Sequence, residues 1–365
     1  MLVKGEQISL DGIERVLLIQ LGDIGDVVLT IPTIKALREN RPAGTLYVMV
    51  REHAKELIED YPYVNGVISV EGAQGNLWER LRYQRGFLKA LRGKKFQAAI
   101  DLRTGTRGAV LSYLSGAPLR IGRYAEDGRL WRNRLFTHLV RPENEMEQYS
   151  SLHSLNIVAP FKVGARDIKP KLTVSREREL RTERILRDEG VPSDRPLLAF
   201  HPFSRWRYKE WPAQNYIALI DHVGSRYPVH IAITGSVDER GRAADLVKET
   251  NTEVYNLAGK TTIGELAGVL KKCNLVIGID SATIHIAAAV GTPTVSIYGP
   301  SAPVNWAPLG EQHLVIFKDL PCVPCRQKGC NHSGVSRCLQ ELEVGEVIEV
   351  LDKKISEILE PTVDD

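Results

Sequence analysis

The chain has 365 residues, of which 25% are charged and 43% hydrophobic, and its formal net charge is +3. This composition is typical of a globular protein, and the length predicts two domains of similar size. No apolar run approaches the ~20 residues that a membrane-spanning helix needs. Glu6 and Asp11 stand where a signal peptide would be apolar. We therefore expect a cytoplasmic protein.

Charge is unevenly distributed along the sequence. The stretch from Arg80 to Arg141, which we term the basic segment, contains 15 Lys or Arg but only three acids, Asp101, Glu126 and Asp127. Such an imbalance predicts an acidic partner, such as a phosphorylated glycolipid, an anionic membrane surface or nucleic acid. The alternative is that these residues form ordinary solvated helix faces.

The first half of the chain alternates short apolar runs with amphipathic stretches, as in a doubly wound α/β domain. A strand is predicted at 15–20, a glycine loop at 21–26 and a helix that continues through Leu37. The elements expected next are strands at 45–50 and 67–70, helices at 54–60 and 77–91, and a strand at 96–101.

The glycine loop contains Gly22, Gly25 and Asp26 in a G-x-x-G-D pattern. This pattern differs from the G-x-G-x-x-G of a dinucleotide site, which disfavours a Rossmann dehydrogenase. Asp26 follows the carboxyl end of a predicted strand, where open α/β sheets bind their ligands. Its carboxylate could accept a proton from a bound hydroxyl. Alternatively, Asp23 or Asp26 only caps the helix.

A linker rich in proline and charge is predicted at 161–171, followed by a second α/β series. The expected elements are a helix at 176–189, strands at 196–201, 229–234, 254–257, 275–279 and 294–298, and a last helix at 344–359. A new helix is also expected from Trp211-Pro212, with the proline at its first position.

Two loops of the second series contain residues suited to a nucleotide. Ser204, Arg205 and Lys209 follow its first strand, where a hydroxyl and cations could bind a diphosphate and neutralise charge on a leaving phosphate. A solvated basic loop is the alternative. Glu239 follows the next strand and could bind a ribose hydroxyl pair, although acidic residues are common in any first helical turn.

The stretch from Gly278 to Pro293 indicates a buried strand that turns directly into a helix. Asp280 or Ser281 can cap this helix, and its free amide groups and dipole form a site for an anion. Ala282 and the alanines that follow would allow close approach of a ligand, and Gly291 ends the helix. The alternative is an ordinary capped helix that packs on the sheet.

Four of the five cysteines are clustered at Cys322, Cys325, Cys330 and Cys338. Such a cluster in a cytosolic chain favours a metal site over disulfides. Its spacing matches none of the usual paired zinc patterns, so free thiols or a redox-sensitive loop are preferred to a structural metal site. Cys273, just before a predicted strand, is expected in the core.

Taken together, these motifs resemble glycosyltransferase family 9, the ADP-heptose:lipopolysaccharide heptosyltransferases. The resemblance is carried in order by Gly25-Asp26, by 203–212, by Gly235-x3-Glu239 and by 280–289. The details of 204–211 and 115–122 are most similar to the core heptosyltransferase III type. Ala282 departs from the pattern, since several members have glycine there.

The resemblance implies a GT-B fold, in which two Rossmann-like doubly wound α/β domains face a central cleft. The acceptor domain would span 1–168 and the nucleotide-sugar domain 169–342. The last segment, 343–365, would form a helix that packs back on the first domain. The family also has a similar cysteine-rich segment near the carboxyl end, so the four cysteines are expected to be a family loop.

The resemblance further implies an inverting transfer of heptose from ADP-heptose to the inner core of lipopolysaccharide, without a metal or other cofactor. Asp26 matches the general base, and Lys209 matches the lysine that stabilises departing ADP. The donor-binding residues would be Ser204, Arg205, Glu239, Thr261, Asp280, Ser281, Ala282 and His285.

Phosphate groups on the acceptor would bind the basic segment, with Arg103, Arg107, Arg120 and Arg123 as candidates. The same segment would hold the enzyme peripherally at the inner face of the cytoplasmic membrane. One alternative is a GT-B enzyme with another sugar nucleotide, such as a UDP-sugar transferase or an epimerase. Another is a non-catalytic protein that binds anions or nucleic acid. No helix-turn-helix or aromatic platform favours nucleic acid.

Overall fold

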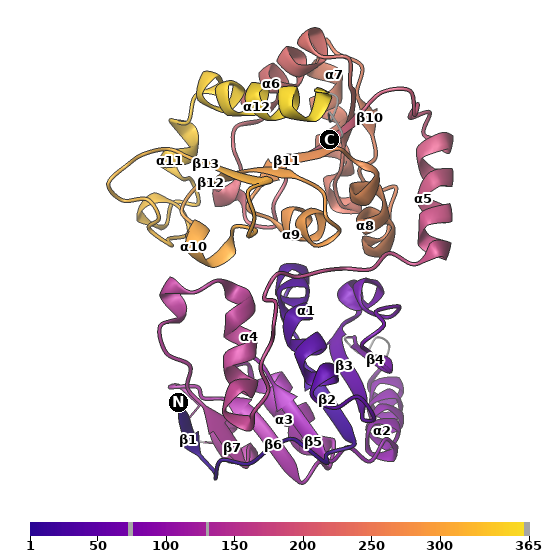
Figure 1. Ribbon diagram of the computed structural model, residues 1–365, viewed down its shortest axis with the longest axis vertical. Helices are drawn as coiled ribbons and strands as arrows, with labels where there is room; N and C mark the ends of the chain where they lie inside the picture. Colours follow the sequence, from indigo (N-terminus) through magenta and orange to yellow (C-terminus); the bar gives the residue numbers. More distant parts are fainter. Residues whose placement is uncertain (72–75, 129–130, 361–365) are drawn as a thin grey trace, which may run out of the picture. The chain divides into compact units, whose positions relative to one another are not determined.

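A computed structural model describes residues 1–71, 76–128 and 131–360. The chain divides into two compact units, Met1–Thr173 (unit 1) and Val174–Asp365 (unit 2). The boundary lies just after the predicted linker, five residues beyond the predicted one. Each unit contains one sheet with helices on both faces (Figure 1).

Unit 1 contains a seven-stranded sheet with the order β1-β7-β6-β5-β2-β3-β4, in which only β1 is antiparallel to its neighbour. Its strands are β1 (Leu2–Lys4), β2 (Arg15–Ile19), β3 (Thr45–Arg51), β4 (Gly66–Val70), β5 (Ala98–Asp101), β6 (Leu119–Arg123) and β7 (His138–Val140). Its α-helices are α1 (Ile24–Glu39), α2 (Leu77–Gly93), α3 (Thr106–Leu114) and α4 (Ser150–Val158).

The core of unit 1 forms on both faces of this sheet. Leu17 and Ile19 of β2 pack in one cluster with Leu91 of α2 and Leu111 of α3. Helix α1 packs against α4, and the hydroxyl groups of Thr30 and Ser154 lie 3.3 Å apart there. The helix expected at 54–60 is instead a 3₁₀ helix over Glu52–Leu57, so that prediction was wrong in type and in bounds.

Unit 2 contains a six-stranded, fully parallel sheet with the order β10-β9-β8-β11-β12-β13. Its strands are β8 (Leu197–His201), β9 (His230–Ile233), β10 (Tyr255–Asn256), β11 (Leu275–Ile279), β12 (Thr294–Tyr298) and β13 (His313–Phe317). Its α-helices are α5 (Arg176–Asp188), α6 (Ala213–Arg226), α7 (Arg240–Glu249), α8 (Ile263–Lys272), α9 (Ala282–Ala289), α10 (Pro303–Trp306), α11 (Arg337–Gln340) and α12 (Val344–Leu359).

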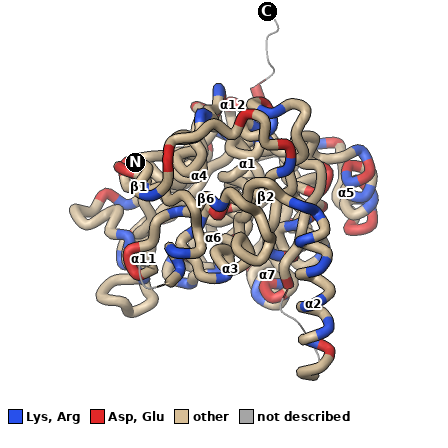
Figure 2. Tube along the Cα trace, turned by 90° about the horizontal axis from the view of Figure 1, so that it is seen from below, with Lys and Arg blue, Asp and Glu red and all other residues tan. Residues whose placement is uncertain are grey.

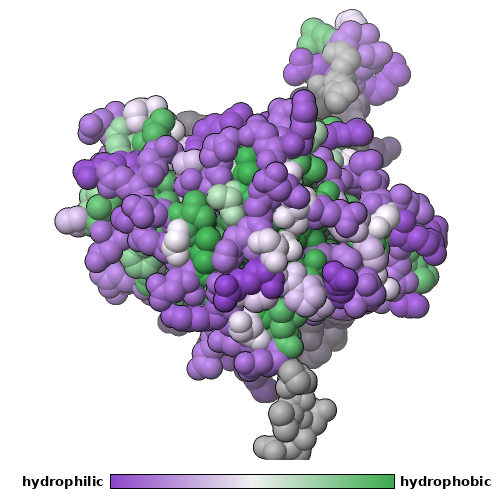
Figure 3. All heavy atoms as spheres, turned by 90° about the horizontal axis from the view of Figure 1, so that it is seen from above, coloured by the Kyte–Doolittle hydropathy of each residue, from purple (hydrophilic) through white to green (hydrophobic). Residues whose placement is uncertain are grey.

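Helices α6, α7 and α12 cover one face of this sheet, and α5, α8 and α9 cover the other (Figure 1). The surface over the first group is mostly hydrophilic, with hydrophobic residues in small groups (Figure 3). Pro212 caps α6 rather than occupying its first turn, so this helix begins one residue later than expected.

The last helix belongs to unit 2. Val347, Leu351 and Ile355 of α12 are buried in the main core of unit 2, and Asp352 accepts a 2.9 Å hydrogen bond from His222 Nε2 of α6. The apolar face of this amphipathic helix is therefore used within unit 2. The prediction that 343–365 packs back on the first domain stays a prediction, and 361–365 lie outside the described residues.

Candidate functional site

The sheet of unit 1 reverses its order between β2 and β5, which are adjacent and parallel. Helices leave the two strands toward opposite faces, so the loops after these strands diverge and open a crevice, where α/β proteins bind ligands. Asp26 follows β2 and Arg103 follows β5. The guanidinium Nη1 of Arg103 donates to Asp26 Oδ2 over 2.6 Å. The predicted base and one predicted acceptor-binding arginine therefore form an ion pair.

The Asp26 carboxylate is fixed through one of its two oxygens. Asp23 caps α1, and its backbone N–H donates to Asp26 Oδ2 over 2.9 Å. No described residue donates to Oδ1, which leaves that atom as the one able to receive a proton from a ligand. A side chain at Gly22 would collide with both Asp26 and Arg103, so this position requires glycine.

A buried ion pair supports the loop that contains Arg103. Arg132 is fully buried, and its Nη2 lies 3.4 Å from Asp101 Oδ2 and donates to the Arg103 carbonyl over 2.6 Å. Burial raises the pKa of Asp101 to about 7, although Arg132 opposes this shift. A Cβ at Gly108 would collide with the Asp101 carboxylate. Sequence reasoning missed Arg132 as a positioning residue.

Arg123 lies at the carboxyl end of β6 and forms an ion pair with Glu145. Burial lowers the pKa of Arg123 to about 10, with a smaller contribution from the nearby charge of Arg103. Arg123 Nη1 donates to the His153 carbonyl. Burial lowers the pKa of His153, with a smaller contribution from the charge of Arg123. Arg103 and Arg123 thus lie at the same edge of the sheet as Asp26.

The other two predicted acceptor-binding arginines are not brought to Asp26. Arg120 lies near the amino end of β6, where it donates to the carbonyls of Leu135 and Ala117 over 2.7 Å each. Arg107, on α3, donates to the Glu71 carbonyl over 3.0 Å and lines a groove between α2 and α3. Arg120 is therefore held by backbone carbonyls away from Asp26, and its role in acceptor binding stays a prediction.

The sheet of unit 2 reverses its order between β8 and β11, which are also adjacent and parallel. Lys209 lies in the loop after β8, and Asp280 follows β11 directly. Lys209 Nζ donates to Asp280 Oδ2 over 2.6 Å, and the two side chains are 21% and 5% exposed. The structure thus joins two residues that were predicted at the donor phosphates.

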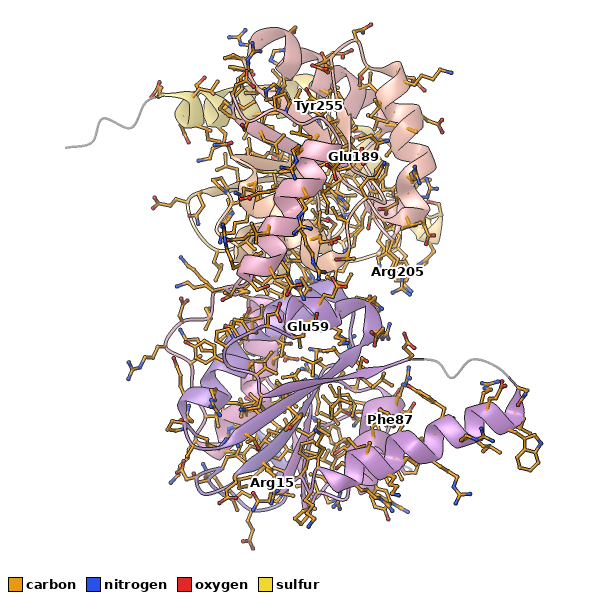
Figure 4. The ribbon with its side chains drawn as sticks, turned by 90° about the vertical axis from the view of Figure 1, so that its right-hand side faces the viewer. Arg15, Glu59, Phe87, Glu189, Arg205 and Tyr255 are labelled. Atoms are coloured by element: carbon orange, nitrogen blue, oxygen red, sulfur yellow. The ribbon has the colours of Figure 1, made fainter. Side chains whose placement is uncertain are left out.

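Glu210 shapes the loop after β8. Its carboxylate accepts two hydrogen bonds from Arg242, at 3.0 and 2.6 Å, and one from the Ser204 backbone N–H at 2.9 Å. The Ser204 hydroxyl accepts from the Trp206 backbone N–H over 3.1 Å. Arg205 is exposed, and its guanidinium lies 5.4 Å from the Trp206 ring centre at the surface of unit 2 (Figure 4). Glu210 was not predicted, although it follows Lys209 directly.

The amino end of α9 has an unsatisfied polar group. Ser281 caps this helix in an extended conformation, but its side chain makes no capping hydrogen bond. The Ser281 hydroxyl is buried and has no hydrogen-bond partner among the described residues. Ala282 is half-buried in the first turn, and His285 is buried one turn later, 6.4 Å from the Trp306 ring. A buried hydroxyl without a partner costs free energy that a bound anion would recover.

Glu239 and Thr261 lie in the loops after β9 and β10. Glu239 Oε2 accepts from the Ser236 backbone N–H over 2.7 Å, so this side chain also closes a capping box. Thr261 is half-buried just before α8. Gly259, at φ +72°, donates to the Gly235 carbonyl over 2.9 Å and so joins the two loops.

His201 lies at the end of β8, beneath these loops. It is buried, its Nδ1 lies 3.1 Å from both the carbonyl and the hydroxyl of Thr234, and burial lowers its pKa. The uncharged ring is therefore favoured.

The cysteines are all free thiols in the described part of the chain. Within that part, no group of three or more His, Cys, Asp or Glu side chains is placed to hold a metal ion. Burial raises the pKa of Cys338 to about 11, and Cys322 is exposed. Cys273 is buried, which confirms its predicted core position. Among the described helices, none is both long and apolar enough to cross a membrane.

Residues 84–336 match the sequence model of glycosyltransferase family 9 (heptosyltransferase). The chain is 27% identical to lipopolysaccharide heptosyltransferase 3 of Escherichia coli, over 78% of this chain and 83% of that protein. Its fold is similar to a family 9 glycosyltransferase from Veillonella parvula, with a TM-score of 0.80, 20% identity and coverage of 97% and 99%. The ADP-heptose lipopolysaccharide heptosyltransferase II of E. coli gives a TM-score of 0.76, 22% identity and coverage of 94% and 99%. These similarities confirm the predicted GT-B type of fold.

Proposed function

The chain belongs to glycosyltransferase family 9, the heptosyltransferases, and on this premise we propose that it transfers a heptose from ADP-heptose to the inner core of lipopolysaccharide. The observation that carries the proposal is the pair of charged sites at the two switch points, Asp26 with Arg103 and Lys209 with Asp280. The first supplies a base beside a cation, and the second supplies a cation for a leaving diphosphate.

In the proposed reaction, the acceptor hydroxyl oxygen attacks the anomeric carbon of the heptose while the bond from that carbon to the β-phosphate oxygen breaks. The hydroxyl proton passes to Asp26 Oδ1, because Oδ2 already accepts from Arg103 and the Asp23 amide. The electron pair of the broken bond stays on ADP. Attack from the side opposite to ADP inverts the anomeric centre.

We assign the donor to unit 2. Lys209 would neutralise the charge that develops on ADP, and Asp280 keeps its ammonium group in place. The Ser281 hydroxyl and the first amide groups of α9 would bind the diphosphate, with Ala282 and His285 beside it. Ser204 and Arg205 would contact phosphate, Glu239 the ribose and Thr261 the adenine. These cations and amides make a metal unnecessary, so chelation with EDTA should leave turnover unchanged.

We assign the phosphorylated acceptor to unit 1, with Arg103 and Arg123 at the edge that carries Asp26. The acceptor hydroxyl is proposed to be that used by the heptosyltransferase III type, on the basis of the 204–211 and 115–122 motifs. The protein would act in the cytoplasm, in peripheral contact with the inner face of the membrane.

The decisive experiment incubates the protein with ADP-heptose and a panel of truncated core acceptors, and measures the products by mass spectrometry. A gain of one heptose on a single acceptor is expected, and it would identify donor and acceptor together. No gain on any acceptor, with a product from a UDP-sugar instead, would contradict the proposal.

Thermal shift with ADP and UDP tests the sugar-nucleotide alternative separately. We expect ADP to raise the melting temperature and UDP to have little effect, since Thr261 and the joined loops after β9 and β10 are assigned to adenine. Stabilisation by UDP alone would favour a UDP-sugar transferase or an epimerase.

A further inference from the structure

The amino-terminal half of α2 lacks the packing that holds the other helices of unit 1. Of its residues only Leu91 is fully buried, Phe87 and Leu88 are half-buried, and residues 77–86 are exposed. Figure 4 shows the helix extending from Phe87 away from the sheet. This half of the helix therefore contributes little to the core.

Three large apolar side chains nevertheless lie on this exposed half of the helix. Leu77, Trp78 and Leu81 are 70%, 78% and 43% exposed. At 3.6 residues per turn they lie within about 100° of the helix circumference. A cluster of large apolar side chains in solvent marks an interaction surface, whereas single exposed residues do not.

The rest of unit 1 does not cover Leu77, Trp78 and Leu81. A groove of about 550 Å³ separates α2 from α3, with Tyr83 and Phe87 on one side and Val110 and Leu114 on the other. Leu77, Trp78 and Leu81 do not line this groove, and residues 77–86 are all exposed, so no described element of unit 1 buries the first two turns of the helix.

The same helix contains the unpaired part of the basic segment. Residues 77–95 include seven Lys or Arg and one acid, Glu79, whose carboxylate accepts from the Asn76 backbone N–H over 2.9 Å. Within the described residues, four cations of this helix form neither an ion pair nor a side-chain hydrogen bond: Arg80, Arg82, Arg85 and Lys89. Arg92, in the last turn, donates to the Leu114 carbonyl. Figure 2 shows that basic positions recur along α2.

Elsewhere in the basic segment, four arginines form ion pairs within unit 1. Arg103 pairs with Asp26, Arg123 with Glu145, Arg132 with Asp101 and Arg141 with Glu126. The largest group of unpaired cations in the segment therefore lies on α2, whose amino-terminal half also has exposed apolar side chains.

We propose that the amino-terminal half of α2 docks on an anionic lipid bilayer. Leu77, Trp78 and Leu81 insert at the boundary between headgroups and acyl chains, and the four unpaired cations bind the phosphate groups of the headgroups. The inference rests on the proposed function, because it takes the membrane that holds the acceptor as the surface. A nucleic acid would leave the apolar cluster unused, and a second copy would face equal positive charge.

The experiment measures flotation of the full-length protein with phosphatidylglycerol vesicles and with neutral phosphatidylcholine vesicles. Leu77→Ser/Trp78→Ser is compared with the control Leu180→Ser/Phe317→Ser, which replaces one exposed leucine and one exposed aromatic residue of unit 2. We expect the α2 variant to lose about tenfold in partitioning to anionic vesicles, and the control to match the wild type.

A charge variant, Arg82→Gln/Arg85→Gln/Lys89→Gln, should lose about a hundredfold in partitioning to anionic vesicles. Added salt should likewise weaken the binding of the wild type to these vesicles. Equal partitioning of the α2 variant and its control would overturn the proposal, as would equal wild-type binding to neutral vesicles. A wild-type dimer that the α2 variant dissociates would assign the face to a second copy. Tighter binding to nucleic acid than to vesicles would also refute it.

Transfer to a soluble, lipid-free acceptor distinguishes this inference from the proposed function. That activity should be unchanged in the α2 variant, while transfer to an acceptor embedded in vesicles falls with the partitioning. If the wild type modifies the soluble acceptor but binds no vesicles, docking by α2 is refuted and the proposed function stands.

Discussion

Each unit has an ion pair at the switch point of its sheet, formed by side chains that follow two adjacent strands. The acid and the cation follow opposite strands in the two units. Unit 1 places an acid, Asp26, after the first strand and a cation, Arg103, after the neighbour. Unit 2 places the cation Lys209 after the first strand and the acid Asp280 after the neighbour. The topology alone brings such loops together, and the sequence decides which charge each one carries.

The two pairs also differ in exposure. Arg103 and Asp26 are 46% and 22% exposed, so a substrate hydroxyl can reach the carboxylate. Lys209 and Asp280 lie deeper, where water screens charge less and a fixed cation acts more strongly on a leaving phosphate. On the assignments proposed above, one type of fold would supply a site for proton transfer in one unit and a site for charge stabilisation in the other.

Of the variants that test the proposed difference between the two ion pairs, Asp26→Asn should have the largest effect. The amide keeps the shape but cannot take the proton, so turnover should fall about 10³-fold. ADP affinity, measured by calorimetry, should be unchanged because the donor is assigned to unit 2. Asp11→Asn, an exposed acid of the same unit, is the control. Full activity of Asp26→Asn would remove the base assignment.

Lys209→Ala tests the other half of the comparison. Loss of the cation at the leaving diphosphate should lower kcat/KM about 10²-fold. Lys271→Ala provides a matched control, since this lysine also pairs with a carboxylate, Glu179, but on the outer helices of unit 2. Equal kinetics of the two variants would show that the Lys209–Asp280 pair is only structural.

Ser281→Ala should have a smaller effect. The hydroxyl has no partner among the described residues, so its removal should leave the free energy of unfolding of the ligand-free protein unchanged or slightly higher. ADP affinity should fall about tenfold if the hydroxyl binds the diphosphate. The control is Ser225→Ala, on α6, whose ADP affinity is measured in the same way. Unaltered ADP affinity would remove Ser281 from the donor site.

The two units should respond to pH with opposite sign. Burial raises the pKa of Asp101 to about 7, so the folded state holds its proton more tightly and this residue costs stability as pH rises from about 4 to 7. Burial lowers the pKa of His201, so the unfolded state binds the proton more tightly and stability falls as pH drops below about 6.5.

Urea unfolding of Asp101→Asn and His201→Gln at pH 5 and pH 7 measures these slopes. Relative to wild type, Asp101→Asn should gain free energy of unfolding as pH rises, by up to about 1.4 kcal/mol per pH unit. His201→Gln should gain as pH falls. Slopes of the same sign in both variants would contradict the comparison.

Much of the fold could be predicted because the central strands are short apolar runs. The predicted bounds agree with β3, β4, β11 and β12 within one residue. The strands β6 and β7 lie in the basic segment, where Arg120 and Arg123 obscure the apolar pattern, and they were missed. β1 has only three residues and pairs at the sheet edge, so it gave no periodic signal.

The individual site residues were predicted, but their pairings were not. Asp26 and Arg103 are 77 residues apart and Lys209 and Asp280 are 71 apart, and such contacts depend on strand order. The supporting residues could have been suspected. Asp101 is an acid at the end of an apolar strand within a basic stretch, which calls for a buried cation such as Arg132.

Gly22 has a consequence for mutational scanning. It has no functional group, yet any side chain there would displace the Asp26 carboxylate from Arg103. A saturation library selected for activity should therefore show position 22 to be as intolerant as position 26. A residue that never touches substrate would then score as catalytic, because it provides the empty space that the base occupies.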